Sequence, residues 1–121
     1  MDVKRGEIVY IDIKNRDNRS SIQTGRRPYL IVQNDKGNES SPTTIVVPIT
    51  SKKDGRNYMP VHIGIMLDKP STILCEQIMT VDKKYIETPI EKRAMLSKRK
   101  MKQVEVALCK SLQISVDKRY V

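Results

Sequence analysis

The sequence lacks tryptophan and phenylalanine altogether, and its 121 residues include five tyrosines, two cysteines and one histidine. A surface of stacked aromatic rings therefore has little to be built from, and phosphate contacts would have to dominate any binding of nucleic acid. Too few cysteines and histidines are present for a four-ligand zinc site, which argues against structural zinc. The sequence also lacks GxGxxG after a strand, GxxxxGK(S/T) and HExxH, so we predict no metal and no cofactor. A single histidine also excludes catalysis by two histidines within one chain.

The histidine and the cysteines lie in apolar surroundings. His62 lies between Val61 and Ile63, a setting typical of a half-buried structural histidine rather than a general base. Cys75 and Cys109 each follow a leucine, which favours two reduced thiols in the core. No apolar run approaches the roughly 18 residues that a membrane span needs. We therefore expect a cytoplasmic protein that does not enter a membrane.

The charge is strongly one-sided. Lysine and arginine number 23 against 14 aspartates and glutamates, so the formal net charge is +9. Such a surface attracts a polyanion or an acidic partner. We favour nucleic acid over a membrane surface, because the basic C-terminal segment has too modest an apolar side to insert into lipid.

Short segments rich in β-branched residues dominate the first two thirds of the chain, whose length fits one domain spanning 1–121. We predict strands over residues 7–13, 29–33, 43–50, 58–65 and 71–81. Pro48 predicts an edge or a bulge within its strand. Between the second and third strands, residues 34–42 hold nearly every turn-forming residue type, which predicts a chain reversal. Five short strands at this spacing favour a small β-barrel or sandwich.

The C-terminal third changes to a helical period. Met101, Val104, Leu108 and Leu112 recur at steps of three and four, which predicts an amphipathic helix over about 97–114 with Ser97 as N-cap. Residues 90–96 suggest another short helical stretch, and 115–121 a polar tail. The pattern as a whole predicts an α+β fold, a small β-barrel with a C-terminal helix packed on it.

Two adjacent arginines are the most distinctive local feature. A polar stretch, residues 20–28, leads through Arg26 and Arg27 into a strand whose start is set by Pro28. The guanidinium group suits bidentate contact with phosphate, although charge alone favours a solvated basic pair. Thr50 ends the third predicted strand and offers a hydroxyl there.

Several segments together resemble the MazF/PemK family of toxins. They are KRGEIVY at 4–10, GRRPYLIVQND at 25–35, SPT at 41–43, PIT at 48–50 and LCEQI with TVDK across 74–83. Because they occur in the family's order and in register from about residue 3 to 114, the resemblance is specific.

The resemblance implies an SH3-like β-barrel and a homodimer. It implies a sequence-specific, metal-independent endoribonuclease toxin that cleaves single-stranded mRNA and so blocks translation. Attack by the ribose 2′-OH would leave a 2′,3′-cyclic phosphate and a 5′-OH. By register, Arg27 and Thr50 match the family's catalytic pair, while Arg26 falls on a variable position. The implied partner is a cognate MazE-like antitoxin with an acidic, disordered tail.

The resemblance also implies residues that bind RNA. They are Ser21, Gln23, Arg26, Asn34, Glu76 and Gln77. Three positions depart from the family's pattern, because Ile22 replaces a glutamate, Thr24 a glycine and Met79 an arginine. The cleavage sequence therefore stays open, and Arg26 or the Lys52–Lys53 pair are candidates to compensate for a lost contact.

Two alternatives remain open from the sequence. A gyrase inhibitor resembling CcdB would share the fold, but that family uses a C-terminal Trp-Gly-Ile, whereas this chain ends in Arg119-Tyr120-Val121. A nucleic-acid-binding barrel without catalysis would bind RNA without cutting it. Substitution of Arg27 distinguishes this binding barrel from the endoribonuclease, because RNA binding without catalysis would survive the substitution.

Overall fold

The computed structural model describes residues 2–13, 25–51, 59–87 and 94–115. Predictions for Ser21, Ile22, Gln23, Thr24, Lys52 and Lys53, and for most of the polar tail, lie outside these ranges. The described elements are β1 (Glu7–Ile13), β2 (Gly25–Ile31), α1 (Asp35–Ser40), β3 (Thr43–Thr50), β4 (His62–Met66), β5 (Pro70–Leu74), β6 (Met79–Asp82), the 3-10 turn η1 (Lys83–Tyr85), β7 (Ala94–Met95) and α2 (Lys98–Leu112).

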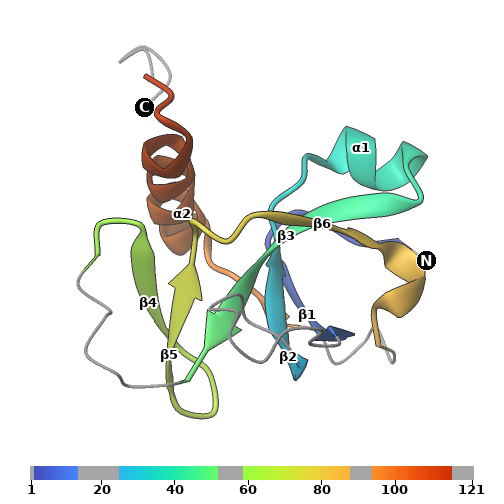
Figure 1. Cartoon of the computed structure of the whole chain (residues 1–121), viewed down its shortest axis with the longest axis horizontal. Helices are drawn as coiled ribbons and strands as arrows, with labels where there is room; N and C mark the ends of the chain where they lie inside the picture. Colours follow the sequence, from blue (N-terminus) through green and yellow to red (C-terminus); the bar gives the residue numbers. More distant parts are fainter. Residues whose placement is uncertain (1, 14–24, 52–58, 88–93, 116–121) are drawn as a thin grey trace.

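The strands form one curled antiparallel sheet in the order β4-β5-β3-β2-β1-β7 (Figure 1). β3 is the branching strand, because β6 pairs with its first half and β5 with its last two residues. The sheet forms half a barrel and the C-terminal helix lies against it. This architecture confirms the predicted α+β fold class.

The two faces of the sheet carry separate cores, since neighbouring residues on a strand point to opposite faces. One core packs under α2: Ile8, Leu30, Val47, Ile49, Ile73, Cys75, Met101, Val104 and Ala107. The other packs on the opposite face: Val3, Val9, Ile11, Tyr29, Ile31, Val46 and Ile86. Because the strands at the centre are buried on both faces, they read as continuous apolar runs.

The helix α2 confirms the predicted C-terminal helix. The Ser97 hydroxyl accepts a hydrogen bond from the backbone N–H of Lys100, as expected of an N-cap. Met101 and Val104 are buried, whereas Leu112 is 57% exposed because the helix extends past the core. Gln113 ends the helix in the left-handed conformation, with φ 56°.

Several predicted boundaries are wrong. The segment predicted as one strand over 71–81 forms β5 and β6, which pair with different parts of β3. β2 begins at Gly25 rather than at residue 29, because pairing with β1 extends it. β4 begins at His62 rather than at residue 58, after a turn in which the His62 N–H donates to the Met59 carbonyl.

Two connecting segments also differ from expectation. The reversal at 34–42 contains the short helix α1, capped by Asn34, whose side-chain oxygen accepts from the Gly37 N–H. The helical stretch expected up to Leu96 is wrong at its end, because Ala94 and Met95 pair with β1 as β7. At Ala94 and Met95 the local helix signal competed with long-range pairing that only the folded chain reveals.

Pro48 lies on β3, which is an interior strand of the sheet rather than an edge. It is the last β3 residue paired with β2, opposite Tyr29. On the other side of β3, pairing with β6 ends at Val46 and pairing with β5 begins at Ile49. The proline therefore occupies the point where β3 changes partners, a position that tolerates a residue without an N–H.

Candidate functional site

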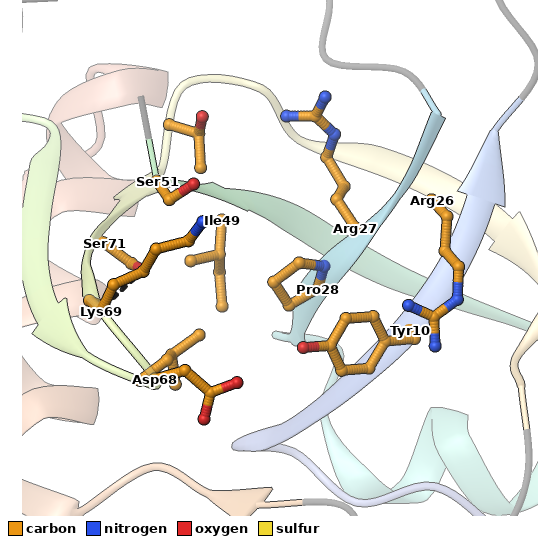
Figure 2. Close-up of a pocket in the computed structure, with 11 residues that line it drawn as sticks. Tyr10, Arg26, Arg27, Pro28, Ile49, Ser51, Asp68, Lys69 and Ser71 are labelled. Atoms are coloured by element: carbon orange, nitrogen blue, oxygen red, sulfur yellow. Dashed lines mark hydrogen bonds between the residues drawn. The ribbon is translucent and has the colours of Figure 1, made fainter. Parts of the chain in front are cut away.

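A cleft of about 230 Å³ opens where β2 begins and β3 ends. The turn between β4 and β5 forms its opposite wall (Figure 2). Its lining residues are Tyr10, Arg26, Arg27, Pro28, Ile49, Thr50, Ser51, Leu67, Asp68, Lys69 and Ser71. The two arginines and Thr50 singled out from the sequence therefore meet in one cleft.

The strand register explains why Arg27 and Thr50 meet. β2 and β3 pair Ile31 with Val46, Leu30 with Val47 and Tyr29 with Pro48. Two further steps along the same register put Arg27 opposite Thr50. No pair is formed there, however, so the strands separate and leave the cleft between them.

The two side chains differ in exposure. Thr50 is 9% exposed, whereas Arg27 is half-buried with its guanidinium group at the cleft (Figure 2). The charge of Arg27 also acts on Tyr29. Burial raises the pKa of the Tyr29 phenol, and the positive charge of Arg27 opposes that rise. The site thus combines a fixed cation with a sheltered hydroxyl, which suits an anionic ligand with hydrogen-bonding oxygens.

Arg26 has partners of its own at the rim of the cleft. Its Nε lies 3.1 Å and 2.9 Å from the two Glu87 carboxylate oxygens, and its guanidinium carbon lies 4.5 Å from the centre of the Tyr10 ring. The hydrogen bond to Glu87 is the main reason that the pKa of Arg26 is raised. Adjacent residues of β2 point to opposite faces, so Arg26 and Arg27 occupy different environments.

Sequence reasoning missed the β4–β5 turn as part of the site. Asp68 and Lys69 are exposed there, and the Lys69 ammonium extends across the cleft toward Ser51 (Figure 2). The Lys69 carbonyl accepts hydrogen bonds from the Leu67 N–H and the Ser71 hydroxyl, which fixes the turn. Only the folded sheet brings the turn at Asp68 and Lys69 to the same cleft as Arg27.

Of the other predicted RNA-binding residues, Asn34, Glu76 and Gln77 lie outside this cleft, while Ser21 and Gln23 fall outside the described ranges. Asn34 caps α1, as described above. Glu76 and Gln77 lie between β5 and β6, where a Glu76 carboxylate oxygen accepts a hydrogen bond from His62 Nε2 at 3.1 Å. The His62 side chain is 6% exposed, as expected of a structural histidine. Their roles toward RNA remain predictions.

Met79 lines a second cavity, of about 510 Å³, formed by residues of β1, β6 and η1. It is partly buried against the core that contains Ile11 and Val46. The departure at Met79 therefore lies apart from the cleft that contains Arg27, and its side chain packs as an apolar residue.

The described residues also bear on the metal and membrane predictions. They contain no cluster of three or more histidine, cysteine, aspartate or glutamate side chains suited to a metal ion. Within the same ranges, no helix is both long enough and apolar enough to span a membrane. Cys75 is buried and Cys109 half-buried, and both are free thiols.

Comparison with known proteins adds a family and a fold. Residues 4–112 match the family of PemK-like, MazF-like toxins of type II toxin-antitoxin systems. An endoribonuclease in complex with its cognate antitoxin, from a mycobacterial species, has a similar structure: TM-score 0.75 and 17% identity, over 95% of this chain and 99% of that one. MazF from Deinococcus radiodurans gives TM-score 0.73 and 17% identity, over 94% and 99% of the two chains. A MazE-MazF structure from the same organism gives TM-score 0.71 and 20% identity, over 93% and 97%.

Proposed function

The chain belongs to the family of PemK-like, MazF-like toxins of type II toxin-antitoxin systems, and from that premise we propose that it is a sequence-specific, metal-independent endoribonuclease acting on single-stranded mRNA in the cytoplasm. Its toxicity would follow from the loss of translatable message. The observation that carries the proposal is the cleft that Arg27 and Thr50 both line, beyond the last pair of β2 with β3. Among similar structures, two from mycobacterial species are named as endoribonucleases.

The chemistry that we propose needs no cofactor. The ribose 2′-oxygen loses its proton and forms a bond to the phosphorus of the adjacent 3′-phosphate. The bond from that phosphorus to the 5′-oxygen of the next nucleotide breaks. That leaving oxygen takes up a proton, and the products are a 2′,3′-cyclic phosphate and a 5′-OH. DNA lacks the nucleophile and is not cut.

The roles of the two residues follow from their chemistry. Because arginine stays protonated, Arg27 acts chiefly by stabilising the negative charge on the pentavalent phosphorus. It also has protons to donate toward the leaving oxygen. Thr50, at 9% exposure, orients a phosphate or ribose oxygen through its hydroxyl. The cleft selects unpaired RNA, since single-stranded bases can be splayed out and read on their edges.

The proposal includes two protein partners. A cognate MazE-like antitoxin with an acidic, disordered tail would bind this chain of net charge +9 and fold on it. The similar mycobacterial structure is of an endoribonuclease in complex with its cognate antitoxin. A homodimer would join two clefts into a longer basic channel for RNA. Light scattering at micromolar concentration tests the dimer, and a monomer there would contradict it.

The test of the enzyme is cleavage of a long single-stranded RNA in the presence of EDTA, beside DNA of the same sequence. We expect discrete RNA cuts with 5′-OH ends, intact DNA, and a loss of roughly 100- to 1,000-fold in Arg27→Ala. Arg99→Ala is the matched control, because Arg99 is an exposed arginine on α2. Mapping the cuts also gives the recognition sequence.

Three other outcomes have separate meanings. Cleavage that stops with EDTA and returns with magnesium would contradict metal independence. RNA that is bound but left intact, with binding unaffected by Arg27→Ala, would identify a binding module. Protein that neither binds nor cuts RNA would direct attention to a protein target.

A further inference from the structure

The cleft contains a phenol that the proposed mechanism does not use. Tyr10 is 38% exposed, and its hydroxyl points into the cleft from the side facing Asp68 and Lys69 (Figure 2). Within the described part of the chain, no group forms a hydrogen bond with that hydroxyl. A polar atom of this kind at the wall of a cleft is available to a ligand.

A closed set of three contacts holds the Tyr10 ring in place. The Arg26 guanidinium lies over the ring at 4.5 Å from its centre. Glu87 forms an ion pair with Arg26 at 2.9 Å. The backbone N–H of Glu87 donates to the Tyr10 carbonyl at 2.9 Å, which completes the set. Each of the three residues is therefore positioned by the other two.

The sheet register produces this arrangement. Tyr10 pairs with Pro28, and Asp12 pairs with Arg26, so Arg26 occupies the diagonal position next to Tyr10 on the same face. Glu87 comes from the segment after η1, which returns to β1 through the bridge between Ile11 and Ile86. With its guanidinium group engaged by Glu87, Arg26 is oriented toward the phenol rather than toward the centre of the cleft.

We propose that Tyr10 is a substrate-contacting residue whose hydroxyl donates a hydrogen bond to a phosphate oxygen of the bound RNA, and that Arg26 and Glu87 are its positioning residues. This inference rests on the proposed function. A phosphate oxygen is the acceptor because the same cleft presents the cations of Arg27 and Lys69. Arg26 covers one face of the ring, so the hydroxyl rather than the ring serves the ligand. The fixed ring lowers the conformational entropy lost on binding.

The first test compares Tyr10→Phe with wild type in RNA cleavage and in binding of a fluorescein-labelled RNA that carries a 2′-deoxy residue at the mapped cut. Loss of a hydrogen bond to a charged group predicts kcat/KM lower by roughly 10- to 100-fold and weaker binding. Tyr85→Phe is the matched control, because Tyr85 is exposed and has the Lys84 ammonium 5.2 Å from its ring centre, yet lies outside the cleft. Its cleavage and binding should equal those of wild type.

The second test asks whether Glu87 acts through Tyr10. We expect Glu87→Gln to lower kcat/KM by about threefold to tenfold in the wild-type background and to have no further effect in Tyr10→Phe. Arg26→Lys, which keeps the charge over the ring, should retain more activity than Arg26→Ala. Glu39→Gln, an exposed change on α1, controls for the loss of one negative charge.

The outcomes distinguish this inference from the proposed function. Wild-type protein that cleaves RNA, with Tyr10→Phe equal to it, overturns the role of Tyr10 alone. Equal effects of Glu87→Gln in both backgrounds overturn the positioning role. If wild type cleaves no RNA, the proposed endoribonuclease function is wrong. Binding of a labelled single-stranded RNA of random sequence then tests whether Tyr10 contacts RNA. Weaker binding by Tyr10→Phe then supports it, and equal or absent binding overturns it.

Discussion

Arg27 and Thr50 occupy opposite positions on neighbouring strands, two residues beyond the last pair that β2 and β3 form, Tyr29 with Pro48. If pairing continued, the two side chains would stand side by side on the face of a closed sheet. Because the strands separate at this point, the guanidinium group and the hydroxyl instead line a cleft of about 230 Å³. A small group with several oxygens can contact both.

The hydroxyl of Thr50 should matter more than its shape. Thr50→Val keeps the β-branched shape and strand preference but removes the hydroxyl, so we expect cleavage slower by roughly 100-fold with a folded protein. Thr50→Ser keeps the hydroxyl and should remain within about tenfold of wild type. Single-turnover cleavage together with thermal unfolding measures both. A valine variant as active as wild type would show that Thr50 only packs.

The helix α2 and the strand β3 could be predicted closely because their patterns are local. The spacing of Met101 and Val104 is that of one helix face, and Ser97 is a typical N-cap. The run from Thr43 to Thr50 is apolar and β-branched, so its strand stands out. The division of residues 71–81 into β5 and β6 could not be predicted, because it depends on the two strands pairing with different parts of β3.

The candidate site was predictable only in part. Arg27 and Thr50 were found through a resemblance, since neither charge nor strand pattern distinguishes Arg27 from Arg26. The structure separates those two by their partners, with Glu87 engaging Arg26. Lys69 could not be found from its neighbours in sequence, because its place in the cleft depends on the pairing of β5 with β3.

Two valines on α2 that differ in burial allow a direct test of the core under the helix. Val104 is fully buried in the core under the helix, whereas Val106 on the same helix is 44% exposed. We expect Val104→Ala to lower the free energy of unfolding by about 2 kcal/mol, through lost burial and the cavity left behind. Val106→Ala should change it by at most about 0.5 kcal/mol. Urea unfolding measures both, and equal losses would contradict the packing described.

We expect the Cys109 thiol to react in the folded protein and the Cys75 thiol to react only after unfolding. Burial raises the pKa of Cys75 to about 12, so at pH 8 the folded protein holds it as an unreactive thiol. In the variant Cys109→Ala, we expect a disulfide reagent to label no thiol in native protein and one thiol after unfolding in urea. Cys75→Ala is the reciprocal variant, in which half-buried Cys109 should react in the native state. Rapid labelling of native Cys109→Ala would contradict the burial of Cys75.

Lys69 should contribute to RNA binding through charge rather than through chemistry. Its ammonium extends across the cleft opposite Arg27 (Figure 2), where it would lie against a phosphate. Each phosphate that a protein neutralises on a single strand contributes about 0.7 to the slope of log K against log salt concentration. Lys69→Ala should therefore weaken RNA binding and reduce the magnitude of that slope by about 0.7, with kcat little changed. Lys36→Ala, an exposed change on α1, is the control and should leave the slope as in wild type. An unchanged slope in Lys69→Ala, or an equal reduction in both variants, would mean that Lys69 adds only to the general charge of the surface.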